Sequence, residues 1–261
     1  MKYNDITKPI GLIDFCSEIT SVCDKAHIYK NCGLKPDHLI VPMDSGCGRT
    51  TILEYMTDMY KQYGILNFSG GLDDYIEVTF DGTPQQLRQV FADIDSAAVY
   101  SNFYSNIVGM DISNIAPHIN ETQFADFLIN IKKVCDHACV VFFVHFVPNR
   151  NEERLIEKLC DSIENIRRLN IEPYTNDEIC SLVMKKIDEH GISIDHKQTF
   201  RSVLSDIVTE FSVLSVKDAI LVADTLVHYA DFSGFTPVVD ENNLKTMIAS
   251  WQNDVKRRDA K

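Results

Sequence analysis

The sequence predicts an α/β fold built on a parallel sheet, followed by a smaller domain made of helices. Residues 38–42 form a short apolar run that passes into a glycine-containing turn and then into an amphipathic segment. Two later runs, residues 105–111 and 138–146, are apolar over most of their length and enclose a segment with helical spacing. Such strands, alternating with helices, are typical of a parallel sheet covered on both faces. In the last third of the chain the strand patterns nearly stop, so the predicted domains are residues 1–172 and 173–261.

Each element follows from its own pattern. Thr83 before Pro84 is a typical helix start, Thr175 with Glu178 forms another, and Gly191 is a typical stop. The helices of the first domain are predicted at residues 10–28, 52–63, 83–94 and 124–134, and its strands at residues 38–42, 75–80, 105–111 and 138–146. The helices of the second domain are predicted at residues 176–190, 197–211, 216–229 and 241–256.

The composition is that of a soluble globular protein, with 45% hydrophobic and 24% charged residues in 261. No apolar run approaches the roughly 20 residues of a membrane span, and no secretory signal pattern opens the chain, so we expect a cytoplasmic protein without a membrane partner. The net charge of −13 argues against direct nucleic-acid binding. The eight cysteines form no C-x-x-C pair, which favours reduced thiols over disulfides or zinc.

A phosphate-binding loop is predicted between the first strand and the following helix. In such a loop, backbone N–H groups of a glycine turn point at an anion beside a helix N-terminus. The intact pattern has a glycine where this chain has Met43 and a lysine where it has Arg49. Arg49 keeps the positive charge but is larger and planar, and the hydroxyl of Thr50 is placed to reach Mg²⁺. The residues predicted to hold ATP or ADP are Ser45, Gly46, Cys47, Gly48, Arg49, Thr50 and Thr51.

Asp111 ends the third predicted strand, where an acid that directs Mg²⁺ toward a nucleotide is expected. Thr50 and Asp111 are therefore the predicted metal residues. An acid at the end of a strand also occurs without any such role. The next position, where a glutamate would activate water in an ATPase of this kind, holds Ile112. Isoleucine neither accepts a proton nor orients a nucleophile, which argues against hydrolysis.

The order of these elements resembles that of the AAA+ ATPases over roughly residues 10–256. Within that superfamily the chain is most similar to the red-type Rubisco activase and stage V sporulation protein K group. Phe80–Thr83 matches the group's Gly-x-Thr pore-loop segment, and Ile166–Glu178 matches its arginine-containing segment and lid start. Gly191–Asp195 repeats the turn that follows the first lid helix.

The resemblance implies roles for single residues. Arg167 or Arg168 stands where the family presents an arginine finger to the neighbouring subunit, although a basic pair also fits a surface salt bridge. His145 stands near the sensor-1 position, although a histidine at a strand end is more often hydrogen-bonded structure. Lys217 aligns with the sensor-2 arginine, and Phe80 with the aromatic pore-loop residue.

The departures at Met43, Arg49, Ile112, His145 and Lys217 affect nearly every catalytic role. We therefore expect a degenerate AAA+ protein that binds ATP or ADP weakly and assembles with itself or with an active AAA+ relative. Hydrolysis is then lost or very slow.

Two alternatives remain open. One is a slow ATPase that remodels a protein substrate and uses another acid, Glu77 or Glu121, for water. The other is a protein-interaction scaffold without nucleotide, in which Met43 and Arg49 fill the former phosphate site.

Overall fold

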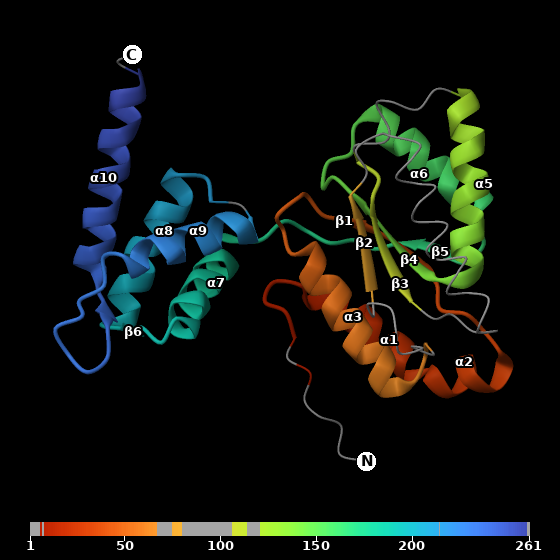
Figure 1. Cartoon of the computed structure of the whole chain (residues 1–261), viewed down its shortest axis with the longest axis horizontal. Helices are drawn as coiled ribbons and strands as arrows, with labels where there is room; N and C mark the ends of the chain where they lie inside the picture. Colours follow the sequence, from red (N-terminus) through yellow and green to blue (C-terminus); the bar gives the residue numbers. More distant parts are fainter. Residues whose placement is uncertain are drawn as a thin grey trace. The chain divides into compact units, whose positions relative to one another are not determined.

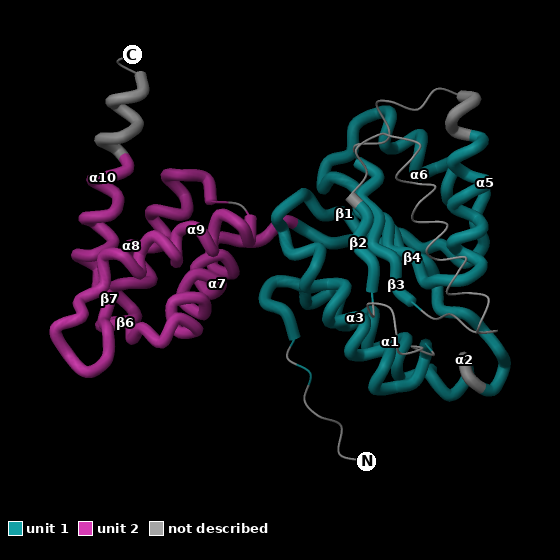
Figure 2. The backbone as a smooth tube through the Cα atoms, in the orientation of Figure 1, with its two compact units in different colours: residues 1–172 teal, residues 173–261 magenta. Residues whose placement is uncertain are grey.

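A computed structural model gives the structure of the protein. It describes residue 6 and residues 8–66, 75–79, 106–113, 121–213 and 215–259, without the side chains of residues 29, 30, 79, 121–124 and 252–259. The chain forms two compact units, residues 1–172 and 173–261, which are coloured separately in Figure 2. The predicted helix at residues 83–94 and Phe80 lie outside the described residues.

The first unit holds a five-stranded sheet in which every pair of neighbouring strands is parallel. Its order is β2-β3-β4-β1-β5, so the strand that leads into the glycine turn lies between the fourth and fifth strands. The strands are β1 (His38–Pro42), β2 (Tyr75–Thr79), β3 (Ile107–Asp111), β4 (Cys139–Val144) and β5 (Ile166–Arg168). The predicted parallel sheet is confirmed, and strand β5 was not predicted.

Helices cover both faces of this sheet (Figure 1). One face carries α1 (Ile13–Asp24) and α3 (Arg49–Tyr63), and the other carries α5 (Glu121–His137) and α6 (Arg150–Ser162). The short α2 (Ala26–Cys32) follows α1. The single helix predicted at residues 10–28 is thus two helices. Helix α6 was not predicted, although Asn149 and Glu152 form a capping box at its start.

Strand alternation sorts the central residues between the two faces. Ile40, Val108, Met110 and Phe142 belong to the apolar core formed with α5 and α6. The intervening residues face α1 and α3. Of these, Glu77 pairs in register with Gly109, and Asp111 pairs with Phe143.

Gly109 lets α3 approach the sheet closely. A Cβ at this position would lie 2.5 Å from Cδ1 of Leu53 in α3 and 3.1 Å from Cε2 of Phe143. Because the first turn of α3 carries Arg49 and Thr50, this close packing holds both side chains near the ends of β2 and β3.

The second unit is mainly helical, with α7 (Asn176–Glu189), α8 (Lys197–Glu210), α9 (Val216–Val227) and α10 (Glu241–Asp259). All four helices were predicted. The strands β6 (Ser193–Ile194) and β7 (Val238–Val239) add a small parallel sheet that was not predicted. At the start of α7 the side chains of Thr175 and Glu178 form the capping box that their spacing indicates. Among the described residues, no helix is long and apolar enough to cross a membrane.

Candidate phosphate-binding loop

The glycine turn connects β1 to α3 and contains two residues in the left-handed region. Gly46 has φ +84° and Gly48 has φ +97°, values that side chains disfavour. The Met43 N–H donates to the Val144 carbonyl at 2.7 Å, which fixes the loop against the end of β4. Gly48 caps α3 without a side chain, so the helix begins with backbone N–H groups that no capping side chain accepts from. This is the backbone geometry that suits an anion.

Arg49 folds inward, beneath the loop, and is only 6% exposed. Its Nε and Nη2 donate to the Met43 carbonyl at 3.0 and 2.7 Å, and its Nη1 donates to Oδ2 of Asp111. The guanidinium carbon lies 5.3 Å from the centroid of the Phe143 ring, within cation–π range. Arg49 is therefore held by the loop, by β3 and by β4 together.

Asp111 is buried and has partners on both carboxylate oxygens. Oδ2 accepts from Arg49, and Oδ1 accepts from the Ser113 N–H at 3.1 Å and from the Ser113 hydroxyl. The carboxylate is thus neutralised by an internal cation and hydrogen-bonded by its own strand end.

Thr50 lies at the exposed edge of the loop, where its hydroxyl donates to Oε2 of Glu77 at 2.9 Å. The slow-ATPase alternative names two acids. Glu77 lies against the loop residue Thr50, whereas the side chain of Glu121, at the start of α5, lies outside the described residues. Ser45 and Thr51 are exposed, and Cys47 is buried.

The oxygen ligands Thr50 and Asp111 have the chemistry that Mg²⁺ prefers. Their arrangement does not suit it, because Arg49 already places a positive charge on Asp111. Ile112, the residue after Asp111, offers no oxygen ligand, and it is 1% exposed in the core on the α5 and α6 face.

His145 follows β4 and is tied to α6. Its Nδ1 lies 2.8 Å from Oε1 of Glu152, a carboxylate that is 1% exposed. The other oxygen of Glu152 accepts from the Asn149 N–H at 2.9 Å. The Phe146 N–H donates to Oδ1 of Asp44 in the glycine turn at 3.2 Å. The segment that carries the predicted sensor is therefore hydrogen-bonded both to the loop and to the cap of α6.

Arg167 and Arg168 are neighbours on the edge strand β5, so their side chains point to opposite faces. Arg167 pairs with Glu18 of α1, and Arg168 pairs with Glu153 of α6 at 3.2 Å. Both arginines are about two-fifths exposed, and ion pairs of this kind contribute little stability. Lys217 is exposed near the start of α9 in the second unit. The roles predicted for these three residues stay predictions.

Burial shifts the pKa values of several groups in the first unit, among them His38 and Cys135. Burial lowers the pKa of His38 from 6.5 to about 4, and its neutral Nδ1 accepts from the Val140 N–H at 3.1 Å. Burial raises the pKa of the Cys135 thiol to about 12, which keeps it protonated at neutral pH. His38 therefore acts as a structural acceptor between β1 and β4.

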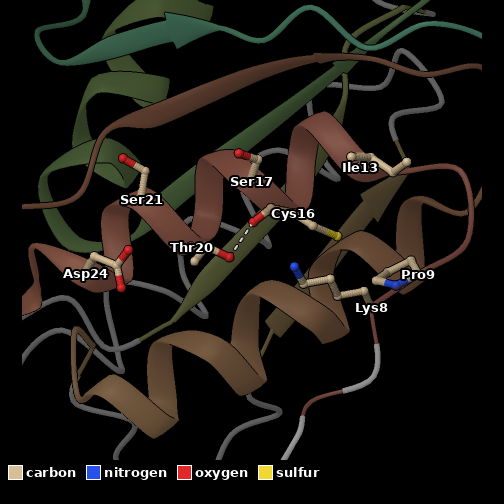
Figure 3. A pocket seen from close by; sticks show the side chains of 8 residues that line it. All are labelled: Lys8, Pro9, Ile13, Cys16, Ser17, Thr20, Ser21 and Asp24. Carbon is tan, nitrogen blue, oxygen red and sulfur yellow. Dashed lines mark hydrogen bonds between the residues drawn. The ribbon is translucent and has the colours of Figure 1, made fainter.

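A pocket of about 470 Å³ lies beside α1 and the segment before it (Figure 3). Lys8 and Asp24 are its charged residues, and Ile13 contributes an apolar edge. The Thr20 hydroxyl donates to the Cys16 carbonyl at 2.7 Å. None of the predicted site residues lines this pocket, so the pocket is not part of the candidate phosphate-binding site.

Comparison with known proteins identifies the fold. No protein-family model matches the chain, and no curated protein matches it in sequence. The Thermotoga maritima RuvB Holliday junction branch migration motor aligns with a TM-score of 0.50 and 11% identity, over 84% of this chain and 63% of RuvB. A variant of that RuvB gives a TM-score of 0.53 and 12% identity, over 92% of this chain and 70% of the variant. C. elegans PCH-2 gives a TM-score of 0.50 and 13% identity, over 94% of this chain and 68% of PCH-2.

RuvB and PCH-2 are AAA+ ATPases, and the parallel sheet with its helices has the AAA+ P-loop fold. The predicted fold class is confirmed. At these identities the likeness concerns the fold alone, and the chain spans less than two thirds of the length of the first RuvB structure. The narrower resemblance to the Rubisco activase group stays a prediction.

Proposed function

We propose that this chain is a hydrolysis-deficient protein of AAA+ fold that binds ATP or ADP weakly and acts as a regulatory or structural subunit of an assembly. The observation that carries the proposal is the side chain of Arg49. It binds the Met43 carbonyl of the loop and the Asp111 carboxylate at the same time. The two groups that would handle phosphate and metal are thus bound to each other.

Loss of hydrolysis is supported by the surroundings of Asp111. Hydrolysis needs a group that orients or deprotonates water. Ile112 is apolar and points into the core, and the Nδ1 of His145 is engaged with Glu152. The acids beside the loop are engaged as well: Glu77 accepts from Thr50, Asp44 accepts from the Phe146 N–H, and Asp111 accepts from Arg49.

Weak nucleotide binding is supported by the backbone. Gly46 and Gly48 keep the left-handed conformations of a phosphate-binding turn, and α3 begins without a capping side chain. Helix N-termini of this kind attract anions. The affinity is low because the charge of Arg49 is already neutralised by Asp111.

A role within an assembly follows from the fold and from β5. Nucleotide sites in AAA+ proteins lie between subunits, so a subunit that does not hydrolyse ATP still contributes residues to the site of its neighbour. Arg167 and Arg168 sit in partly exposed ion pairs that separate at little cost. Either is therefore able to serve a second copy or an active AAA+ relative.

A nucleotide-free scaffold is the second candidate, and one observation favours it. Met43 is fully buried, and Arg49 forms three hydrogen bonds with groups of the protein itself, two to the Met43 carbonyl and one to Asp111. In that case the loop is a structural joint between the sheet and α3.

Isothermal titration calorimetry with ATP and ADP tests the proposal. We expect a Kd on the order of 0.1–1 mM that weakens in Thr51→Glu and is kept in Thr51→Gln. Thr51 is exposed in the first turn of α3, where a carboxylate suits the helix but repels a phosphate. The two variants differ in charge alone. An absence of heat with either nucleotide would establish the scaffold and reject the nucleotide proposal.

A further inference from the structure

We infer that the guanidinium of Arg49 takes the place of a divalent cation beside Asp111, so that the loop binds phosphate groups in their metal-free form. The part that concerns phosphate rests on the nucleotide binding proposed above. The part that concerns the cation depends only on the contacts of Arg49.

The guanidinium of Arg49 lies beside Asp111, where a divalent cation would be held. An Mg²⁺ ion in such a site is held by one or two carboxylates together with phosphate oxygens and water. Asp111 is the buried carboxylate available, and Nη1 of Arg49 donates to its Oδ2. A divalent ion on the same carboxylate would lie against a fixed positive charge in a site of low water content, where like charges repel strongly.

Arg49 is held on more than one side. Nε and Nη2 both donate to the Met43 carbonyl, and the guanidinium lies over the Phe143 ring. A lysine has one ammonium group and does not form this fork. The arginine therefore stays beside Asp111 where a lysine would turn toward a ligand.

Both carboxylate oxygens of Asp111 already have partners within the protein. The second oxygen of Asp111 accepts from the N–H and the hydroxyl of Ser113. An arginine has five N–H donors, and these contacts use three of those on Arg49. The other two N–H groups form no hydrogen bond among the described residues.

The ligand that fits is a nucleoside di- or triphosphate without bound metal. Its phosphate charge meets the loop N–H groups and a guanidinium that is always protonated. Chelating the Mg²⁺ raises the negative charge of the nucleotide and leaves the protein site unchanged.

Calorimetry with ADP and ATP in excess Mg²⁺ and in EDTA tests the phosphate part on the full chain. We expect the wild-type Kd to be equal or tighter in EDTA. The matched variant Arg49→Lys regains a preference for Mg²⁺ of about tenfold. A wild-type Kd that is about tenfold tighter with Mg²⁺ overturns the inference.

Electron paramagnetic resonance of Mn²⁺ tests the cation part without nucleotide, so it remains decisive if nucleotide binding itself fails. Wild type is expected to bind no Mn²⁺ that depends on Asp111. Arg49→Gln, which keeps an amide donor for the Met43 carbonyl, is expected to gain one Mn²⁺ that is lost in Arg49→Gln/Asp111→Asn. Circular dichroism confirms that each variant is folded, and Arg49→Ala repeats the gain. Mn²⁺ binding by wild type that Asp111→Asn removes, or no gain in either Arg49 variant, contradicts the inference.

Discussion

The pairing of Arg49 with Asp111 predicts a large loss of stability when one partner is removed. Their side chains are 7% and 8% exposed, so this pair belongs among buried ion pairs. Breaking such a pair costs about 3–5 kcal/mol, because a buried charge is left uncompensated. We expect the lower end, about 3 kcal/mol, for Arg49→Met, since Asp111 keeps its hydrogen bonds from Ser113.

The double variant Arg49→Met/Asp111→Asn should recover most of that loss. Replacing both members of a buried ion pair by uncharged groups is often neutral or stabilising. For the first unit, residues 1–172, a loss of 3 kcal/mol lowers Tm by about 6–12 °C. The two single variants and the double variant then form a cycle with a coupling of about 2 kcal/mol or more.

Urea denaturation followed by two signals measures this cycle. Far-UV circular dichroism reports helices of both units, whereas the single tryptophan, Trp251, reports α10 of the second unit. Because Arg49 lies in the first unit, its substitution should lower the urea midpoint of the circular dichroism transition more than that of the fluorescence transition. The reasoning is refuted if Arg49→Met changes stability by less than about 0.5 kcal/mol, or if the double variant loses the sum of the two single losses.

Three further predictions concern the surroundings of the loop. Ile112→Glu should not restore ATP hydrolysis and should cost about 3 kcal/mol or more in urea denaturation, because it buries a charge in the core; a folded variant that turns over ATP contradicts this. Burial lowers the pKa of His38 from 6.5 to about 4, so as the pH falls the unfolded chain binds this proton at a higher pH than the folded chain does. The free energy of unfolding should therefore be constant with respect to His38 above pH 6.5 and fall by up to about 3 kcal/mol toward pH 4, and His38→Asn should flatten that profile. Gly109→Ala should lose about 1–3 kcal/mol through its clash with Leu53, and the same substitution should cost less when it is made in a Leu53→Ala background, whereas an unchanged melting curve for Gly109→Ala would show that α3 is not held so closely.

The fold class was readable because its signals are local. The apolar run before the glycine turn, the apolar strand that ends in Asp111 and the capping box at Thr175 each lie within a few residues of sequence. Helix α6 was missed although its signal is also local, since Asn149 and Glu152 stand three apart at its start. Strand β5 was not, because three residues that include two arginines carry no strand pattern.

The candidate site was readable only as a set of residue types. Sequence placed Arg49 and Asp111 in the same site but left open whether the arginine folds into the loop. That direction depends on a hydrogen bond between residues 62 apart and on a carbonyl, Met43, whose orientation no side-chain pattern specifies. The contact between Thr50 and Glu77 likewise depends on how closely α3 packs on the sheet.

Single-turnover hydrolysis of ATP tests the central claim most directly. Excess protein is mixed with radiolabelled ATP, and phosphate release is compared between wild type, Asp111→Asn and Glu77→Gln. We expect the three proteins to release phosphate at the same background rate, because Arg49 holds Asp111 in the wild type. Release by wild type that either substitution abolishes would contradict this expectation and establish a working, slow ATPase.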